Sequence, residues 1–340
     1  MKFYNVFILS FLLLTGCGKS KNEVYKINGF TMGTTYSITV VKNSKKEHSF
    51  DLLKTKIDSV LAEVNNKMST YQKDSELSLF NESSSTDWYL MSDDLFNVVK
   101  TARKISEETS SAYDISVGPI VNLWGFGPEA RPIKRPTEKE ILERRDYVGL
   151  SKYQLDDNSL KIKKAHKDLY IDLSSIAKGF GVDEVGRLLS SLSYTDYMVE
   201  VGGEVFVKGK NQSGTKWNIG ISVPDGSNEI QRIVSISGNA LATSGDYRNY
   251  FEENGVRYSH TIDARTGKPI THKLVSVSVI SDDCMNADGW ATALNVIGAE
   301  EGRKIAENNN MAVLFIVKEG NLFKEIMTDE FKKYLAGRNK

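Results

Sequence analysis

The stretch Ile171-Asp172-Leu173-Ser174-Ser175-Ile176-Ala177-Lys178-Gly179-Phe180-Gly181 decides the fold class, because it joins a strand pattern to a helix pattern through a turn of small residues. The apolar run 171–173 predicts the end of a strand, and the pattern over 176–189 predicts a helix. Helix N-termini offer free N–H groups to anions. Lys178 lies in the first turn, where a positive charge opposes the helix dipole. This placement is unfavourable unless an anion is nearby. The turn is therefore either an anion site or a plain helix start, with Asp172 as its N-cap and Lys178 in solvent.

Strand and helix patterns continue on both sides of this turn without a regular strand–helix alternation. Helices are expected over 51–68, from Ser92, near 141–145, and over 287–297 and 300–308. Strands are expected over 35–41, 198–201, 204–208, 217–223, 230–236, 275–280 and 312–318. This mixture favours the α+β class over a doubly wound sheet. We expect one large domain over 28–335 with mixed sheets and helices, either undivided or in two lobes with the active site in the cleft.

The first 16 residues follow the order of a signal peptide. Lys2 is the only charge before the apolar run 6–14, which is too short to span a bilayer as a helix. Leu14-Thr15-Gly16-Cys17 comes next and resembles the bacterial lipobox, in which the chain is cut before the cysteine and the thiol takes a diacylglycerol. The polar segment 17–27 would then be a short tether. The alternative is an ordinary signal peptide with a chance cysteine.

The charge balance argues against a nucleic-acid partner. Removing Lys2 with the signal takes the 44 basic residues to 43 against 44 acidic ones, a net charge of −1, whereas nucleic-acid binding usually needs a basic face. Only two cysteines are present. If Cys17 carries a lipid, Cys284 has no partner within the chain, so no internal disulfide is expected although export would permit one.

Asp288 and Thr292 form a candidate metal site. They are four residues apart in a helical pattern, so both side chains lie on one face. A carboxylate and a hydroxyl on one face offer two hard oxygen ligands, which suit Mg²⁺. An Asp and a Thr at this spacing also occur as ordinary surface decoration.

His260 is a candidate general base. It comes just before Asp263-x-x-Thr266-Gly267, a pattern typical of a turn because short polar side chains bond back to the backbone. A histidine with an ordinary pKa near about 6.5 exchanges protons at neutral pH. A histidine packed inside a strand is the equally consistent alternative.

Aromatic residues and glycines gather in two loops. The longest irregular segment, 118–136, contains four of the six prolines and is expected to line a surface or a cleft. Its rings and glycines, together with 114–119, could sandwich a flat ligand, or Trp124 could pin the loop to the core. The glycines of 29–34 would let backbone approach a ligand closely, or form a plain turn.

Taken together and in this order, the motifs resemble the ApbE family of FAD:protein FMN transferases. The matching pieces are 31–34, 68–71 with 74–77, 114–127, 172–181, 201–204, 243–248, 258–267 and 287–292. The similarity runs over residues 29–320, nearly the whole mature chain. Eight ordered motifs are far more specific than any one of them, and many members of the family are lipoproteins.

The resemblance implies an ApbE-like catalytic domain that splits FAD between its phosphates, joins FMN to a Thr or Ser hydroxyl of a target protein and releases AMP. It also implies Mg²⁺ held by Asp288, Thr292 and the backbone carbonyl of Ser175. Some relatives have a second Asp where this chain has Ala291. One ligand is therefore missing here, and a water is the expected replacement.

Flavin contacts carried over from the family fall on Met32, Tyr71, Ala112, Tyr113, Asp114, Asp172, Lys178 and Ile262. Position 178 varies in type among relatives. His260 matches a histidine thought to assist the family's catalysis, and we assign it as general base toward the acceptor hydroxyl. Two alternatives use nearly the same site: an FAD pyrophosphatase with water as acceptor, and a flavin-binding lipoprotein without chemistry.

The resemblance also indicates where such an enzyme would work. The expected acceptors are subunits of membrane redox complexes, such as ion-pumping quinone or ferredoxin oxidoreductases. The expected location is a membrane, through the lipid on Cys17, on the periplasmic or extracytoplasmic side. Position 18 is Gly rather than the Asp that commonly retains lipoproteins at the inner membrane, so the outer membrane stays open. The expected substrates favour the inner membrane.

Overall fold

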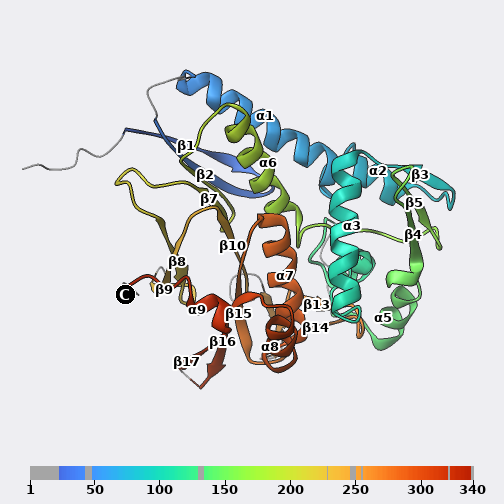
Figure 1. Ribbon diagram of the computed structural model, residues 1–340. Helices are drawn as coiled ribbons and strands as arrows, with labels where there is room; N and C mark the ends of the chain where they lie inside the picture. The colour runs from blue at the N-terminus through green and yellow to red at the C-terminus, as the bar shows by residue number, and fades with distance from the viewer. Residues whose placement is uncertain are drawn as a thin grey trace, which may run out of the picture.

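A large antiparallel sheet forms the centre of the fold. The computed structural model describes residues 23–42, 48–128, 134–227, 229–245, 250–253, 256–320 and 322–337. Neighbouring strands of the eight-stranded sheet all run antiparallel. In spatial order they are β1 (Val24–Thr31), β2 (Thr34–Val41), β6 (Tyr197–Val201), β7 (Glu204–Lys208), β10 (Asn239–Gly245), β15 (Leu274–Ser281), β16 (Ala312–Glu319) and β17 (Leu322–Met327) (Figure 1).

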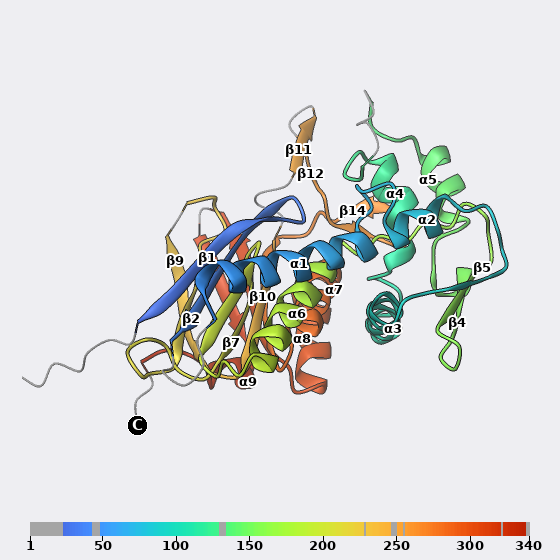
Figure 2. The same ribbon diagram turned by 90° about the horizontal axis from the view of Figure 1, so that it is seen from above.

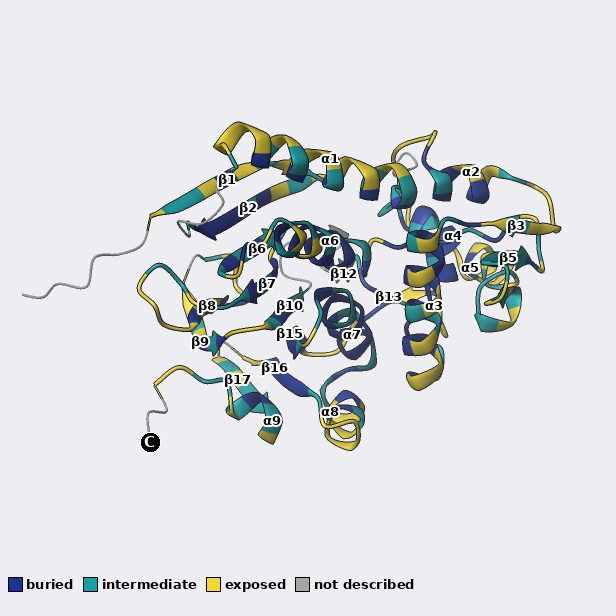
Figure 3. Cartoon of the chain, turned by 45° about the horizontal axis from the view of Figure 1, so that its top comes forward, coloured by how far each residue is buried: buried dark blue, intermediate teal, exposed yellow. Residues whose placement is uncertain are grey.

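Helices cover one face of this sheet (Figure 2). They are α1 (Phe50–Met68), α6 (Ala177–Ser191), α7 (Cys284–Ile297) and α8 (Ala299–Asn308). In α1 the apolar residues Leu53, Ile57 and Leu61 recur every four positions and are buried, so the helix presents one stripe to the sheet. Figure 3 shows this stripe as the buried side of α1, with exposed residues facing solvent.

The opposite face of the sheet has its own core. Side chains alternate along a strand, so Val313 and Phe315 of β16 face the helices while Leu314 and Ile316 face the other way. That second face is covered by the hairpin of β8 (Trp217–Ser222) and β9 (Ile230–Ile236) and by the short helix α9 (Asp329–Lys332).

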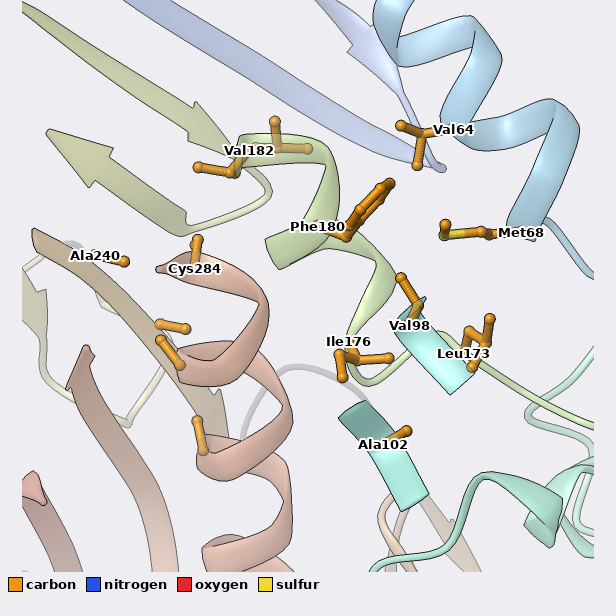
Figure 4. Packing of buried hydrophobic residues seen from close by; sticks show 14 of the residues in the cluster. Val64, Met68, Val98, Ala102, Leu173, Ile176, Phe180, Val182, Ala240 and Cys284 are labelled. Atoms are coloured by element: carbon orange, nitrogen blue, oxygen red, sulfur yellow. The ribbon is translucent and has the colours of Figure 1, made fainter. Parts of the chain in front are cut away.

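Residues between α1 and α6 build a smaller lobe at one side of the sheet (Figures 1 and 2). Its elements are α2 (Glu76–Glu82), β3 (Trp88–Leu90), α3 (Asp93–Glu108), α4 (Gly118–Leu123), α5 (Glu138–Arg145), β4 (Tyr153–Asp156) and β5 (Lys161–Lys164). The three strands pair in the order β3-β5-β4. One apolar cluster includes Val98 and Ala102 of α3 together with Ile176 and Phe180 (Figure 4). The two lobes therefore share a core.

The chain between β10 and β15 makes two small hairpins. They are β11 (Tyr250–Glu253) with β12 (Val256–Ser259), and β13 (Ile262–Asp263) with β14 (Lys268–Pro269). The backbone of Asp263 accepts hydrogen bonds from the N–H groups of Thr266 (3.1 Å) and Gly267 (2.8 Å). Gly267 has a φ of +70°, which favours glycine. The predicted Asp-x-x-Thr-Gly turn is therefore confirmed.

The α+β class is confirmed, and most expected elements form within a few residues of their predicted bounds. The predicted strand end over 171–173 is wrong. The side chain of Asn81 donates to the Ile171 carbonyl and accepts from the Ile171 N–H, both at 2.8 Å. The Asn81 side chain thus takes the hydrogen bonds that a neighbouring strand would otherwise make with the Ile171 backbone.

Two further expectations are corrected. The segment 118–136 is not wholly irregular, because α4 occupies Gly118–Leu123 with Pro119 in its first turn. The missing N–H of a proline costs no hydrogen bond there, because N–H groups of the first turn have no partner within the helix. Residues 129–133 of that segment lie outside the described residues. The predicted tether 17–27 is also too long at its end, because β1 begins at Val24 and pairs with β2 from that residue on.

The predicted signal peptide and Cys17 lie outside the described residues. Across the part of the chain that the structure describes, no helix has both the length and the hydropathy of a membrane span. Cys284 is buried at the start of α7 and has a free thiol.

Candidate active site

A cavity of about 930 Å³ opens between the two lobes. The predicted site residues that line it are Met32, Tyr71, Tyr113, Asp114, Asp172, Ser175, Lys178, His260, Ile262, Asp288 and Thr292. Ala112 does not line it. That residue is fully buried among Ile270, Val296 and Ile297, and its carbonyl accepts a hydrogen bond from the Ala264 N–H.

A close approach of α6 to α7 shapes the floor of the cavity. The N–H of Gly179 donates to Oδ2 of Asp288 at 3.0 Å. A Cβ at Gly179 would lie 2.7 Å from the carbonyl carbon of Cys284 and 2.8 Å from the Cβ of Asp288, so only glycine permits this distance. One turn further along α6, the carboxylate of Asp183 accepts from the N–H groups of Cys284 (2.8 Å) and Met285 (2.9 Å). Glycine and carboxylate together fix α7 against α6.

Three charged groups meet at this junction. Nζ of Lys178 lies 3.8 Å from Oδ2 of Asp288 and 3.6 Å from Oε1 of Glu204. Both carboxyl groups are buried, and Oε2 of Glu204 has no hydrogen-bond partner among the described residues. The alternative that Lys178 simply points into solvent does not hold: its side chain is 27% exposed, but its ammonium lies between two carboxyl groups that line the cavity.

Burial is the largest influence on these three groups. It raises the pKa of Glu204 to about 8, although Lys178 acts in the opposite direction. It also raises the pKa of Asp288 in spite of Lys178 and the Gly179 N–H. Burial alone would lower the pKa of Lys178, but Asp288 and Glu204 outweigh it and the pKa is raised. One ammonium serves two buried carboxyl groups, so both of them ionise readily only if a further positive charge is supplied.

Glu204 was not among the residues predicted for the site. It follows a tight turn between β6 and β7 in which Gly202 and Gly203 have φ angles of +61° and +102°. A Cβ on Gly202 would lie 2.8 Å from Thr34 Cγ2 and 3.3 Å from Lys178 Cδ. The sequence signal was the acidic residue directly after two glycines, which places a carboxyl group at the end of a hairpin.

A second set of hydrogen bonds orders the cavity wall near Tyr113. The hydroxyl of Ser175 donates to the hydroxyl of Tyr113 at 3.1 Å. Burial raises the pKa of Tyr113 above its ordinary value, so this phenol is neutral. Asp114 accepts from the N–H and hydroxyl of Ser116, at 2.9 and 2.7 Å, and burial raises its pKa. Asp172 accepts from the Ser174 N–H at 2.8 Å; it is not the N-cap of α6, which is Ile176.

Aromatic and thioether side chains surround the mouth of the cavity. Met32 lines it from the turn between β1 and β2 and has a φ of +49°. Tyr71 is 68% exposed, and its hydroxyl donates to the Phe126 carbonyl at 3.4 Å. The ring of His260 lies 6.3 Å from that of Phe126 in an edge-on arrangement. Aromatic rings and a thioether thus line this part of the cavity and could contact a flat ligand.

Asp288 and Thr292 line the cavity from one face of α7, as their spacing predicts, and Ser175 lines it from the turn before α6. In a regular helix the Gly179 N–H would donate to the Ser175 carbonyl. Here it donates to Asp288 instead, so it does not occupy that carbonyl. Within the described residues, no group of three or more His, Cys, Asp or Glu side chains is placed to hold a metal. A cation here would therefore combine one carboxylate with neutral oxygens, a donor set that fits Mg²⁺.

Comparison with known proteins identifies close relatives over almost the whole chain. The model of the ApbE family matches residues 32–315. The FAD:protein FMN transferase of Vibrio cholerae is 47% identical, covering 99% of this chain and 100% of the relative, and that of Haemophilus influenzae is 43% identical, covering 95% and 94%. A solved structure of the flavin transferase ApbE from Vibrio cholerae superposes with a TM-score of 0.86 at 46% identity, covering 92% of this chain and 99% of that one. The apo form of the Pseudomonas stutzeri flavinyl transferase ApbE gives 0.85 at 34% identity, covering 94% and 98%.

Proposed function

The chain belongs to the ApbE family and is an FAD:protein FMN transferase, and we propose that it joins FMN to a Thr or Ser hydroxyl of an acceptor protein with release of AMP. The acceptor oxygen attacks the phosphorus that stays with FMN. The bond from that phosphorus to the bridging oxygen breaks, and AMP leaves with the bridging oxygen and the electron pair. The observation that carries this proposal is a single cavity with an aromatic mouth and a charged floor.

The two ends of the cavity suit the flavin ring and the diphosphate of FAD. The isoalloxazine ring would lie at the mouth against Tyr71, Met32 and Ile262, and near the turn formed by Tyr113 and Asp114. The diphosphate would then reach the charged floor, where Lys178 supplies positive charge. Ala112 would contribute through the shape of that turn rather than through its side chain. Asp172 lines the same cavity.

The oxygen donors at the floor fit a divalent cation. Asp288, Thr292 and the carbonyl of Ser175 would hold Mg²⁺, in keeping with a buried cluster in which a single ammonium faces two carboxyl groups. When bound, Mg²⁺ would neutralise charge on the diphosphate oxygens and on the departing AMP. Ala291 supplies no oxygen in this set, so a water would fill that position.

His260 is the proposed general base toward the acceptor hydroxyl. It lines the same cavity, on the side of Phe126 and close to the mouth through which an acceptor would enter. Taking the hydroxyl proton as the oxygen attacks lowers the barrier to transfer. An open cavity mouth suits a hydroxyl carried by a protein rather than by a small molecule. The peptide that carries the Thr or Ser would stay outside, and only its side chain would enter.

We further propose that the enzyme is a lipoprotein, anchored by Cys17 on the periplasmic side of a membrane. The N-terminal sequence supports this proposal, since a charged start, a short apolar run and a lipobox-like tetrapeptide follow one another. Acceptors in membrane redox complexes would lie within reach of such an anchor. The near-zero net charge gives no reason to expect a nucleic-acid partner.

The decisive experiment mixes the chain without its first 17 residues with FAD, Mg²⁺ and an acceptor domain carrying one reactive Thr. A matched acceptor with Val at that position is the control. Transfer predicts flavin fluorescence on the denatured band of the Thr acceptor only. Release of AMP without labelling would instead indicate FAD hydrolysis, and neither product would indicate flavin binding alone.

A further inference from the structure

Lys178 is held between two carboxyl groups without a short contact to either. Its Nζ is 3.8 Å from Asp288 and 3.6 Å from Glu204, and it donates a long hydrogen bond of 3.4 Å to the Ser174 carbonyl. Strong charge-assisted bonds between ammonium and carboxylate groups are shorter, at about 2.7–2.9 Å. The ammonium is therefore shared, and a small rotation of its flexible stem would commit it to one partner.

Glu204 is placed to accept the Lys178 ammonium by itself. It is buried, and its Oε2 has no hydrogen-bond partner among the described residues. The hairpin that carries it packs on the stem of Lys178, because a Cβ on Gly202 would already lie 3.3 Å from Lys178 Cδ. The positive φ angles of Gly202 and Gly203 fix the direction of this hairpin. A buried carboxyl group with one unbonded oxygen thus faces an ammonium that makes no short contact.

A divalent cation on Asp288 would compete with Lys178 for the same oxygens. Two positive charges on one buried carboxylate repel each other strongly, because little solvent screens them. If Lys178 had no second partner, its repulsion would weaken cation binding. A second carboxylate that accepts the ammonium removes this obstacle and keeps Lys178 inside the cavity.

We propose that Glu204 is a positioning residue that receives Lys178 when a divalent cation binds Asp288. The cation and the ammonium exchange places on Asp288, and Glu204 holds the ammonium beside the cavity floor. This inference rests on the proposed Mg²⁺ site, and it concerns how this chain's own side chains make room for the cation.

The test measures Mg²⁺ binding by titration calorimetry on metal-free protein, without FAD or acceptor. The variants are Glu204→Gln, Lys178→Met and the double substitution, with Glu143→Gln as a control that removes an exposed carboxylate paired with Lys139. We expect Glu204→Gln to weaken Mg²⁺ binding at least tenfold, because Lys178 then stays on Asp288. Lys178→Met should bind at least as tightly as the wild type, and the double variant should bind like Lys178→Met.

The double variant decides between two roles of Glu204. If Glu204→Gln weakens binding by the same factor whether position 178 is Lys or Met, Glu204 acts on the cation directly and the exchange is wrong. An unchanged affinity in Glu204→Gln, with a normal thermal unfolding curve, also overturns it. Asp288→Ala separates this failure from that of the metal site: if Asp288→Ala still binds Mg²⁺ normally, the proposed site itself is wrong.

Discussion

Substituting Gly179 by Ala should disable the enzyme through the junction of α6 and α7. The added Cβ would lie 2.7 Å from the Cys284 carbonyl carbon and 2.8 Å from the Asp288 Cβ, and closer still to the Cys284 oxygen. Carbon atoms in contact sit about 3.5–4.0 Å apart, so the two helices must separate by about 1 Å. That movement breaks the bond from the Gly179 N–H to Asp288.

The expected cost has two parts. Overpacking of this kind destabilises a core by about 1–3 kcal/mol. A displacement of about 1 Å in a catalytic arrangement lowers the rate on the order of 100-fold. We therefore expect kcat for FMN transfer to fall on the order of 100-fold, with a moderate decrease in thermal stability and with FAD binding at the mouth largely retained.

The matched control is Gly186→Ala on the same helix. Its Cβ would meet Phe206 at 3.4 Å, an ordinary contact, and Ala is favoured over Gly in a helix by about 0.5–1 kcal/mol. Gly186→Ala should leave transfer unchanged and stability equal or slightly higher. The reasoning is refuted if Gly179→Ala transfers FMN at the wild-type rate, or if both variants lose activity equally.

Three other changes test separate parts of the site. Asp288→Ala should abolish Mg²⁺-dependent turnover with any acceptor, and full turnover in the presence of Mg²⁺ would contradict the metal assignment. His260→Ala should slow transfer while FAD affinity, measured by flavin fluorescence, stays nearly unchanged; an equal loss of both would make His260 structural. Burial raises the pKa of Asp183 from 3.8 to about 6, so between these pH values the unfolded chain has lost this proton while the folded chain keeps it, and stability falls as the pH rises. The difference corresponds to about 3 kcal/mol, and thermal unfolding of Asp183→Asn across this range should lack that fall.

Local patterns sufficed for many elements. Thr137 and Glu140 form a reciprocal capping box at α5, and Ser92 caps α3 through the Leu95 N–H; both signals lie within four residues of chain. The spacing of Asp288 and Thr292 placed both on one face of α7, and the structure has both lining the cavity. Such features depend on residues close together in the sequence, so they can be predicted from the sequence alone.

Other features depend on residues far apart in the chain. The extended backbone at Ile171 is satisfied by the Asn81 side chain 90 positions earlier, which a strand pattern over three residues could not reveal. Glu204 matters because it lies 3.6 Å from Lys178 of α6, whose ammonium also lies 3.8 Å from Asp288 of α7. The place of the Lys178 ammonium between two carboxyl groups, which decided against the alternative that it points into solvent, follows from the same tertiary contact.

The most direct test of transfer as opposed to hydrolysis compares two products in one reaction. With FAD, Mg²⁺ and the Thr-bearing acceptor, AMP released and FMN bound covalently to the acceptor are measured at successive times. Transfer to a hydroxyl predicts equal amounts of both throughout, and no AMP when the Val-bearing acceptor is supplied. AMP in excess of bound FMN, formed at the same rate with either acceptor, would contradict the account.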